Sequence, residues 1–275
     1  MKNPYLSFVE SIAEAVGAGR KIPCGGIQPG KSGGSPDGGT VLLFSPHPDD
    51  ECITGLLPLR LMREAGMKIV NVPVTFGSDV ERQPGRAAEL RNACGIFGWD
   101  VFRRPAGFQA LEKAGVIEIL KKVQPEIIFV PHAKDWNSRH ISTHFLVMEA
   151  LAEMGENFSC TVIETEYWRA MESPNLMVEA DVSTLADLVA ALSCHVKEVE
   201  RNPYHLSLPA WMQDNVRRGG ELIGGQGGAA PDFTFATLYR LRRWERGACR
   251  EILKRGWFIS MQDDPKIFNN GQESL

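Results

Sequence analysis

Apolar runs of strand length alternate with segments of helical spacing through most of the chain, and this alternation limits the fold more than any other feature. The runs predict strands at residues 41–45, 68–76, 126–131, 160–168 and 176–182, with a shorter strand within 99–105. The segments between them predict helices over residues 52–66, 85–98, 109–123, 140–155 and 183–201. Strands that are apolar throughout are typical of parallel sheets buried on both faces. We therefore expect an α/β fold, with a Rossmann-like, mostly parallel sheet and helices on both faces.

The two ends of the chain depart from this pattern and divide it into three parts. Residues 1–37 contain an amphipathic helix followed by a Gly/Pro-rich loop, and residues 38–202 form the alternating core. Residues 203–275 are expected to contain a loop or lid at 203–232 and a C-terminal helix near 234–254. We expect these parts to complete a single domain.

Composition and charge exclude several classes of protein. Of the 275 residues, 43% are hydrophobic and 23% are charged, which is typical of a globular protein with a proper core. The formal net charge is −4, so we expect neither nucleic acid nor an anionic membrane as a partner. No apolar run approaches the roughly 18–20 residues of a membrane-spanning helix, and Glu10 and Glu14 interrupt the apolar N-terminus, unlike in a signal peptide.

Cysteine usage indicates a reducing compartment. The six cysteines form no CxxC pair, so reduced thiols and a cytoplasmic location are expected. The sequence leaves open whether the chain forms a homo-oligomer.

Two clusters of ionisable residues directly follow predicted strands. The sequence SPHPDDE begins at the end of the strand 41–45, and PHAKDWNSRHISTH begins at the end of the strand 126–131. Together the clusters contain four of the six histidines. Ligand sites of such sheets lie at the carboxyl ends of the strands. Both clusters are therefore expected at one edge of the sheet, as two halves of one site.

The residue types in these clusters are those that bind a catalytic zinc ion, which takes about three protein ligands and keeps one position open for water. His47 and Asp50 are three residues apart on a turn and can point at one position. The second cluster offers three candidates for the third ligand, His132, His140 and His144. A turn with an aspartate N-cap is the structural alternative for His-Pro-Asp-Asp.

The other two acidic residues of the first cluster have different expected tasks. Asp49 lies beside the ligand pair and is free to accept a proton from water. Glu51 is expected to support the site from the start of the following helix, where a negative charge suits the helix dipole.

These motifs resemble those of the PIG-L/LmbE family of zinc-dependent N-deacetylases. SPHPDDE follows a strand, and the pattern R-x-x-E-L-x-x-A-x-x-x-F-G follows at the family's usual separation, here from Arg86 to Gly98. A His/Asp cluster then follows a later strand, and weaker similarity continues to about residue 200. The resemblance implies that residues 38–202 are a catalytic core of the PIG-L/LmbE type.

The resemblance also implies roles for individual residues. His47 and Asp50 match the first two zinc ligands, His140 matches the third, and Asp49 matches the general base. Arg86 matches a position that contacts polar groups of the substrate.

The second motif departs from the family pattern, which is usually His-Pro-Asp-His. Here Asn137 replaces the first histidine, which is thought to polarise the substrate carbonyl. An amide nitrogen can donate a hydrogen bond to an oxyanion but cannot move a proton, and His144 could serve instead. The remaining polar residues of the clusters are expected to orient the ligands from behind: Glu51, His132 and Asp135.

The function that the resemblance implies is a hydrolase with one Zn²⁺ per chain, or Fe²⁺ in its place. It would remove the acetyl group from an N-acetylated amino sugar such as GlcNAc, or from its glycoside. The candidates for the surface that contacts the sugar ring are Trp136, Trp168, Tyr204 and Trp211. The arginines of the final helix could contact a phosphorylated sugar or form a solvated face: Arg240, Arg242, Arg243, Arg246 and Arg250.

Two other functions remain open from the sequence. One is a metal-dependent amidase that acts on a non-sugar conjugate. The other is a catalytically weakened protein that binds metal or sugar, which Asn137 favours and Asp49 opposes. Nucleotide binding is not expected, because no Gly-rich loop follows the first strand.

Overall fold

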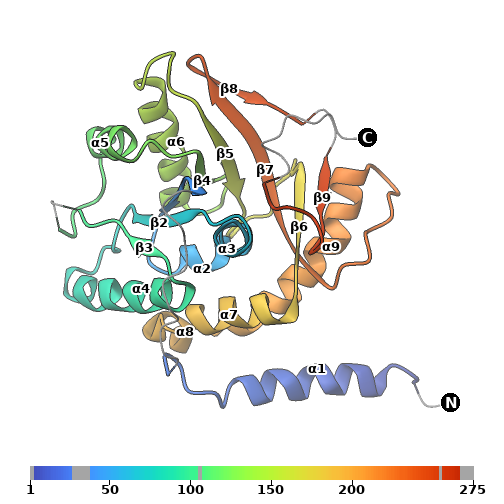
Figure 1. Ribbon diagram of the computed structural model, residues 1–275. Coiled ribbons are helices and arrows are strands. Elements are labelled where there is room, and N and C mark those ends of the chain that lie inside the picture. Colours follow the sequence, from blue (N-terminus) through green and yellow to red (C-terminus); the bar gives the residue numbers. More distant parts are fainter. Residues whose placement is uncertain (1–2, 27–37, 105–106, 254–255, 267–275) are drawn as a thin grey trace.

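The computed structural model describes residues 3–26, 38–104, 107–253 and 256–266 of the chain (Figure 1). The strands are β1 (Thr40–Ser45), β2 (Lys68–Pro73), β3 (Asp100–Val101), β4 (Ile127–Pro131), β5 (Cys160–Thr165), β6 (Leu176–Ala180), β7 (Phe235–Glu245), β8 (Ala248–Glu251) and β9 (Trp257–Ile259). They form one sheet in the order β3-β2-β1-β4-β5-β7-β6-β9, with β8 paired to β7. Among these strands, β7 runs against its neighbours β5 and β6, whereas β1 to β5 pair in parallel. The mostly parallel α/β fold predicted from the apolar runs is confirmed.

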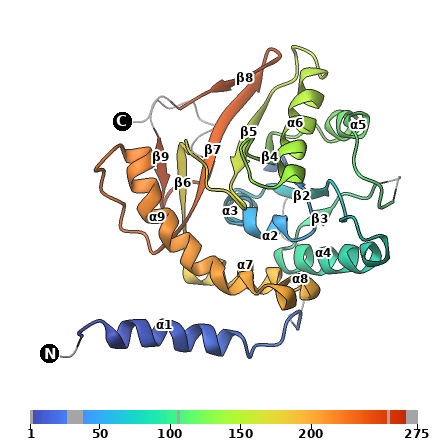
Figure 2. The ribbon, with the colours of Figure 1, turned by 180° about the vertical axis from the view of Figure 1, so that it is seen from behind.

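Helices cover both faces of this sheet (Figures 1 and 2). The α-helices of the described residues are α1 (Leu6–Gly19), which lies apart from the sheet, α2 (Asp50–Thr54), α3 (Leu56–Arg63), α4 (Gln83–Phe97), α5 (Lys113–Val123), α6 (Ser138–Ala152), α7 (Val182–Leu192), α8 (Val196–Arg201) and α9 (Leu208–Gly224). Val41 and Leu43 of β1 pack with residues of α2, α3, α4 and α7, whereas Leu42 and Phe44 pack with residues of α5 and α6. Alternate side chains of one strand thus enter two separate cores, which explains why the strands are apolar throughout.

The strand order places the site. The chain moves outward from β1 to β2 and β3 in one direction, and from β1 to β4 and β5 in the other. The carboxyl ends of β1 and β4 therefore lie side by side where the order reverses, which is where ligands bind in open α/β sheets. The two ionisable clusters of the sequence follow these two strands.

Two predictions for residues 203–275 are wrong. The segment 203–232 is not a structureless loop, because it contains the 17-residue helix α9 after a short 3-10 helix η3 (Tyr204–Ser207). The segment 234–254 is not a helix but the hairpin of β7 and β8. Its arginines consequently form no helix face: Arg242 pairs with Glu164, and Arg240 pairs with Glu251.

The helix predicted near the N-terminus is confirmed as α1, which lies outside the layers of the main body (Figure 1). None of its residues is buried, and its large apolar side chains are exposed, among them Leu6, Phe8, Val9 and Ile12. Most of the Gly/Pro-rich loop predicted after it lies outside the described residues. Within the described part of the chain, every helix is too short or too polar to cross a membrane.

Candidate metal and active site

Three predicted ligands meet where β1 and β4 end. His47 and Asp50 lie on the turn from β1 into α2, and His140 lies in the first turn of α6. Asp50 Oδ2 is 3.3 Å from His47 Nδ1 and 3.3 Å from His140 Nε2. One donor atom from each residue lies within 4.8 Å of the other two. This spacing suits a metal ion bound between two imidazoles and a carboxylate.

The surroundings of His140 fit a cation. Its ring is fully buried, and neither ring nitrogen has a hydrogen-bond partner among the described residues. Burial disfavours a charged imidazole, but Asp50 and Asp135 outweigh this and raise the pKa of His140 to about 10. The two histidines in turn hold the pKa of Asp50 well below its usual range, although burial opposes this. The cluster therefore holds positive charge, a proton or a metal ion, between its acidic groups.

The other two histidines of the second cluster point elsewhere. His144 Nδ1 lies 2.9 Å from the carbonyl oxygen of Pro131 and 3.6 Å from Glu164 Oε1. His132 Nε2 lies 2.9 Å from the carbonyl oxygen of Arg169. Among the described residues, neither belongs to the group of donor atoms that His47, Asp50 and His140 bring together.

Asp49 is held beside the ligands in an unusual backbone conformation. Its φ angle is 123°, a region that residues other than glycine rarely adopt. Its backbone N–H donates to Glu51 Oε2 at 2.9 Å, and the Tyr204 hydroxyl donates to its Oδ2 at 2.5 Å. Its other oxygen, Oδ1, lies 3.9 Å from Arg86 Nη2. Strain of this kind persists only where the surrounding contacts fix the backbone, and it is concentrated at functional sites.

The environment of Asp49 suits a proton acceptor. Burial and the neighbouring Asp50 carboxylate raise its pKa to about 7, against the opposing effects of His195, Tyr204 and Arg86. A carboxylate with a raised pKa accepts a proton more readily than an ordinary aspartate does at neutral pH.

Glu51 lies behind Asp49, as its predicted supporting role requires. Besides accepting the Asp49 N–H, its carboxylate lies 2.7 Å from Nε2 of the fully buried His195 and accepts from Cys52 Sγ at 3.4 Å. Burial raises the pKa of the Cys52 thiol well above its usual value, so this cysteine is a poor nucleophile.

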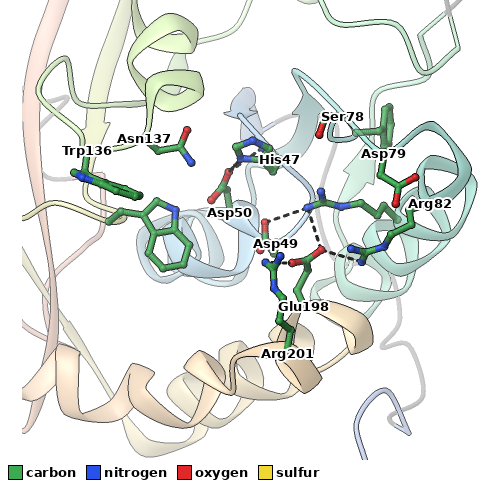
Figure 3. Close-up of a pocket in the computed structure, with 13 residues that line it drawn as sticks. His47, Asp49, Asp50, Ser78, Asp79, Arg82, Trp136, Asn137, Glu198 and Arg201 are labelled. Atoms are coloured by element: carbon green, nitrogen blue, oxygen red, sulfur yellow. Dashed lines mark hydrogen bonds and ion pairs between the residues drawn. The ribbon is translucent and has the colours of Figure 1, made fainter.

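Asn137 caps a helix and also lines the pocket. Its Oδ1 accepts the backbone N–H of Arg139 at 2.8 Å and caps helix α6, which leaves the amide nitrogen free. Asn137 lines the pocket, and its amide nitrogen points toward the side on which His47 lies (Figure 3). Asp135 accepts the backbone N–H of Asn137 at 2.8 Å and lies 3.6 Å from His140 Nδ1, so it orients both halves of this segment.

A pocket of about 430 Å³ with two different sides is lined by His47, Asp49, Asp50 and Asn137, whereas the buried His140 is not part of its lining (Figure 3). On one side of His47 and Asp50 lies Trp136, whose side chain is 78% exposed at the rim. On the other side lie charged residues that the sequence analysis did not select: Arg82, Glu198 and Arg201. Trp168 also lines the pocket, whereas Trp211 packs against the core.

The missed residues come from segments without a recognisable motif. Arg82 precedes helix α4, and Glu198 and Arg201 lie in α8, about 150 residues beyond the first cluster. For Arg82, the sequence offers one signal: this residue lies close to the R-x-x-E-L helix motif.

Comparisons with known proteins agree with these observations. Residues 42–151 match the model of the PIG-L family, described as GlcNAc-PI de-N-acetylase. No curated protein sequence matches the chain.

Several solved structures share the fold. The 4-carboxy-2-hydroxymuconate hydratase GalB from Pseudomonas putida is 18% identical, with a TM-score of 0.56 over 74% of this chain and 95% of that one. The conserved protein TT1542 from Thermus thermophilus is 16% identical, with a TM-score of 0.56 over 73% of this chain and 93% of that one. The N,N'-diacetylchitobiose deacetylase from Pyrococcus horikoshii is 16% identical, with a TM-score of 0.53 over 90% of this chain and 94% of that one.

At these identities the structural likeness shows a common fold, while the family match covers both ionisable clusters and the helix motif between them. The resemblance drawn from the sequence is confirmed, because residues 42–151 match the model of the PIG-L family.

Proposed function

We propose that this protein is a metal-dependent deacetylase that removes the acetyl group from an N-acetylated amino sugar or its glycoside. The observation that carries the proposal is the meeting of His47, Asp50 and His140 within 4.8 Å, with Asp49 held beside them in a strained backbone. A site built merely to bind a metal has no need of a second buried carboxylate with a raised pKa next to its ligands.

The metal would be held by His47, Asp50 and His140, with zinc as the expected ion and Fe²⁺ as the alternative. When bound, such an ion supplies a Lewis acid that lowers the pKa of water and polarises a carbonyl group. Asp135 would keep the His140 ring in place through its Nδ1 side. The Tyr167 ring packs edge-on against His140, with 4.8 Å between ring centroids, and restrains it from another direction.

The residues of the chain then divide the work of amide hydrolysis. Asp49 accepts a proton from the water that attacks the acetamide carbonyl, while Tyr204 fixes one of its oxygens and leaves the other free to act. The free amide nitrogen of Asn137 donates to the carbonyl oxygen as negative charge develops there. Asp49 returns the proton to the amine as the C–N bond breaks, which gives acetate and a free amine.

Three further observations support a sugar substrate. Trp136 and Trp168 offer aromatic surface at the rim, which can stack on the apolar face of a sugar ring. The cavity volume of about 430 Å³ is that of a small-molecule site. The matching family model is described as a GlcNAc-PI de-N-acetylase, and a deacetylase of diacetylchitobiose shares the fold.

The proposal is tested by measuring acetate release from a panel of N-acetyl sugars with zinc-loaded protein and with an Asp49→Asn variant. We expect the variant to bind zinc stoichiometrically but to lose at least about a hundredfold in rate, the scale of general-base catalysis. The exposed Asp187, which pairs with Arg63 on the surface, supplies the matched control Asp187→Asn, and this variant should keep wild-type activity.

Absence of acetate release from every amide would overturn the proposal. Because a hydratase shares the fold, the same samples should also be assayed for water addition to an unsaturated carboxylic acid. Such an activity without deacetylation would assign the site to that reaction instead.

A further inference from the structure

One carboxylate on the charged side of the pocket is surrounded by three arginines. Arg82 Nη2 lies 2.9 Å from Glu198 Oε1, Arg201 Nη2 lies 2.5 Å from Glu198 Oε2, and Arg86 Nη2 lies 4.0 Å from Oε1 (Figure 3). Burial favours the protonated form of Glu198, but Arg86, Arg201 and Arg82 outweigh it and lower the pKa of this group. Glu198 is therefore ionised and holds the guanidinium groups together.

The positive charge on this side exceeds the negative charge. If Asp49 and Asp50 offset a divalent ion at the ligand cluster, the remaining charged groups of the pocket lining are the three arginines, Glu198 and Asp79. Asp79 Oδ1 accepts the backbone N–H of Glu81 at 3.2 Å, so this carboxylate also caps a short 3-10 helix, η2 (Val80–Arg82). Three positive and two negative groups leave a surplus of one positive charge, which one anionic group would neutralise.

The arginines keep donors for such a group. A guanidinium has five N–H donors in a planar fork that fits a carboxylate or phosphate. Arg82 Nε and Arg86 Nε are both buried and lack a hydrogen-bond partner among the described residues, so this feature does not separate the two arginines. The exposed fraction of the side chain does: it is 73% for Arg201 and 27% for Arg82, but 13% for Arg86. Arg86 is more fully committed, because its Nη2 donates to the carbonyl oxygen of Pro48 at 3.0 Å and faces Asp49. Arg82 and Arg201 are thus the pair with capacity for a ligand.

We propose that Arg82 and Arg201, held by Glu198, form a subsite for an anionic group of the substrate, a phosphate or a carboxylate. This inference rests on the proposed deacetylase function and adds the substrate class. Figure 3 places Trp136 on one side of His47 and Asp50, and Arg82 and Arg201 on the other. A substrate that spans the pocket would stack its sugar ring toward the tryptophan and direct its charged substituent to the arginines, with the acetamide between them.

The test compares three substrates that differ at the anomeric oxygen of N-acetylglucosamine. They are the neutral methyl glycoside, the 1-phosphate and the glycoside of glycolic acid, which carries a carboxylate. We expect zinc-loaded wild-type protein to prefer a charged substrate by at least about tenfold in kcat/KM, the scale of a charge-assisted hydrogen bond. The two charged arms decide whether the group is a phosphate or a carboxylate.

Two variants and one control locate the effect. Arg82→Ala and Arg201→Ala should each remove most of the preference for the charged substrate, measured within each variant as the ratio of kcat/KM for the charged substrate to kcat/KM for the methyl glycoside. Arg217 is a matched control, because it also pairs with an acidic residue three positions earlier on a helix, Asp214, and does not line the pocket. Arg217→Ala should retain the full preference.

Binding separates failure of this inference from failure of the proposed function. Titration of wild-type protein with glucosamine 1-phosphate and with methyl glucosaminide measures the subsite without turnover. Tighter binding of the phosphate, lost in Arg201→Ala, would support the subsite even if no substrate is hydrolysed. Equal kcat/KM and equal binding for charged and neutral compounds would overturn it, whether or not the neutral substrate is deacetylated.

Discussion

His195 Nε2 lies 2.7 Å from Glu51 Oε1, which joins the start of helix α8 to helix α2 across 144 residues of sequence. Both side chains are fully buried, and the other oxygen of Glu51 accepts the backbone N–H of Asp49. The pair therefore fixes the strained backbone of Asp49 from below and attaches to the core the segment that carries Glu198 and Arg201. One buried ion pair connects the two halves of the pocket.

The first prediction concerns the dependence of stability on pH. Burial alone lowers the pKa of His195, but Glu51 outweighs it, so that the pKa of His195 is raised in the folded protein. A histidine whose pKa is higher in the folded than in the unfolded protein stabilises the fold fully at pH values below its unfolded pKa of about 6.5. This stabilisation is lost as the pH rises through the pKa of the folded protein. The midpoint of thermal unfolding of His195→Gln should therefore differ most from wild type in acid and approach it at alkaline pH.

Differential scanning calorimetry between pH 5 and pH 10 in the presence of EDTA would measure this, since the chelator removes the linkage to metal binding. The Gln variant keeps a hydrogen bond to Glu51 without a titrating group. Two curves separated by a constant interval at all pH values would contradict the prediction.

The second prediction separates two histidines four residues apart on α6. His140→Ala removes a proposed ligand and should abolish stoichiometric zinc binding, whereas His144→Ala should keep it. His144 instead bonds the Pro131 carbonyl and lies near Glu164, so its loss should lower the free energy of unfolding by about 1–3 kcal/mol, the cost of unpaired buried polar groups. Metal analysis and urea unfolding of both variants provide the measurements, and a zinc-free His144→Ala protein would show that the third ligand is misassigned.

The sequence was sufficient for the parallel half of the fold because the strands there are short and mostly apolar, and β1, β2 and β4 are each followed by a helix. The sequence-based prediction was wrong at β7, because the spacing of its arginines is also compatible with one face of a helix. The missed signal is the turn of the hairpin, Arg246-Gly247. The φ angles are positive at both residues, 52° at Arg246 and 72° at Gly247, and a two-residue turn of this kind favours glycine at its second position. The strand itself is also rich in aromatic and β-branched residues such as Thr237, Tyr239 and Trp244.

Helix α9 was missed for a different physical reason. Its Gly219 and Gly220 gave the segment the composition of a loop, but they allow the helix to pack closely against strand β6 and against the segment that follows the helix. A Cβ at Gly219 would come within 2.5 Å of Met177 Cε, and one at Gly220 within 2.8 Å of Ala230 Cα. Sequence composition cannot distinguish glycine that gives freedom to a loop from glycine that makes room for packing.

The candidate site was predictable where two short motifs follow two adjacent strands, and less so where single residues arrive from distant segments. The motifs placed His47 and Asp50 beside the histidines of the second cluster, and the family resemblance selected His140, which lies next to the first two. Tyr204 was considered as a sugar-binding aromatic residue, yet its hydroxyl donates to Asp49. That contact depends on how η3 packs over the pocket, and no local pattern encodes it.

The third prediction concerns α1. Because none of its residues is buried, deletion of residues 1–17 should shift the midpoint of thermal unfolding by no more than about 2 °C. The deletion ends before Gly19, whose backbone approaches Leu206. Zinc content and acetate release should also be unchanged, and a fall of ten degrees or more would show that α1 contributes to the folded core.

The last prediction assigns Tyr204 a positioning role. In Tyr204→Phe, Asp49 Oδ2 loses its donor, and the carboxylate is no longer held in one orientation while its backbone stays fixed by Glu51. A hydrogen bond to a charged group is worth about 1.5–3 kcal/mol, so kcat should fall by about tenfold or more. KM for the N-acetyl sugar should change little if the hydroxyl acts through Asp49 and not on the substrate.

Tyr239→Phe is the control, because this buried hydroxyl also makes hydrogen bonds, to Thr54 and Leu57, but outside the pocket lining. The Tyr239→Phe variant should have a lower midpoint of thermal unfolding, but its folded form should keep the kcat of the wild type. An increase in KM with unchanged kcat in Tyr204→Phe would instead make Tyr204 a residue that binds the sugar directly.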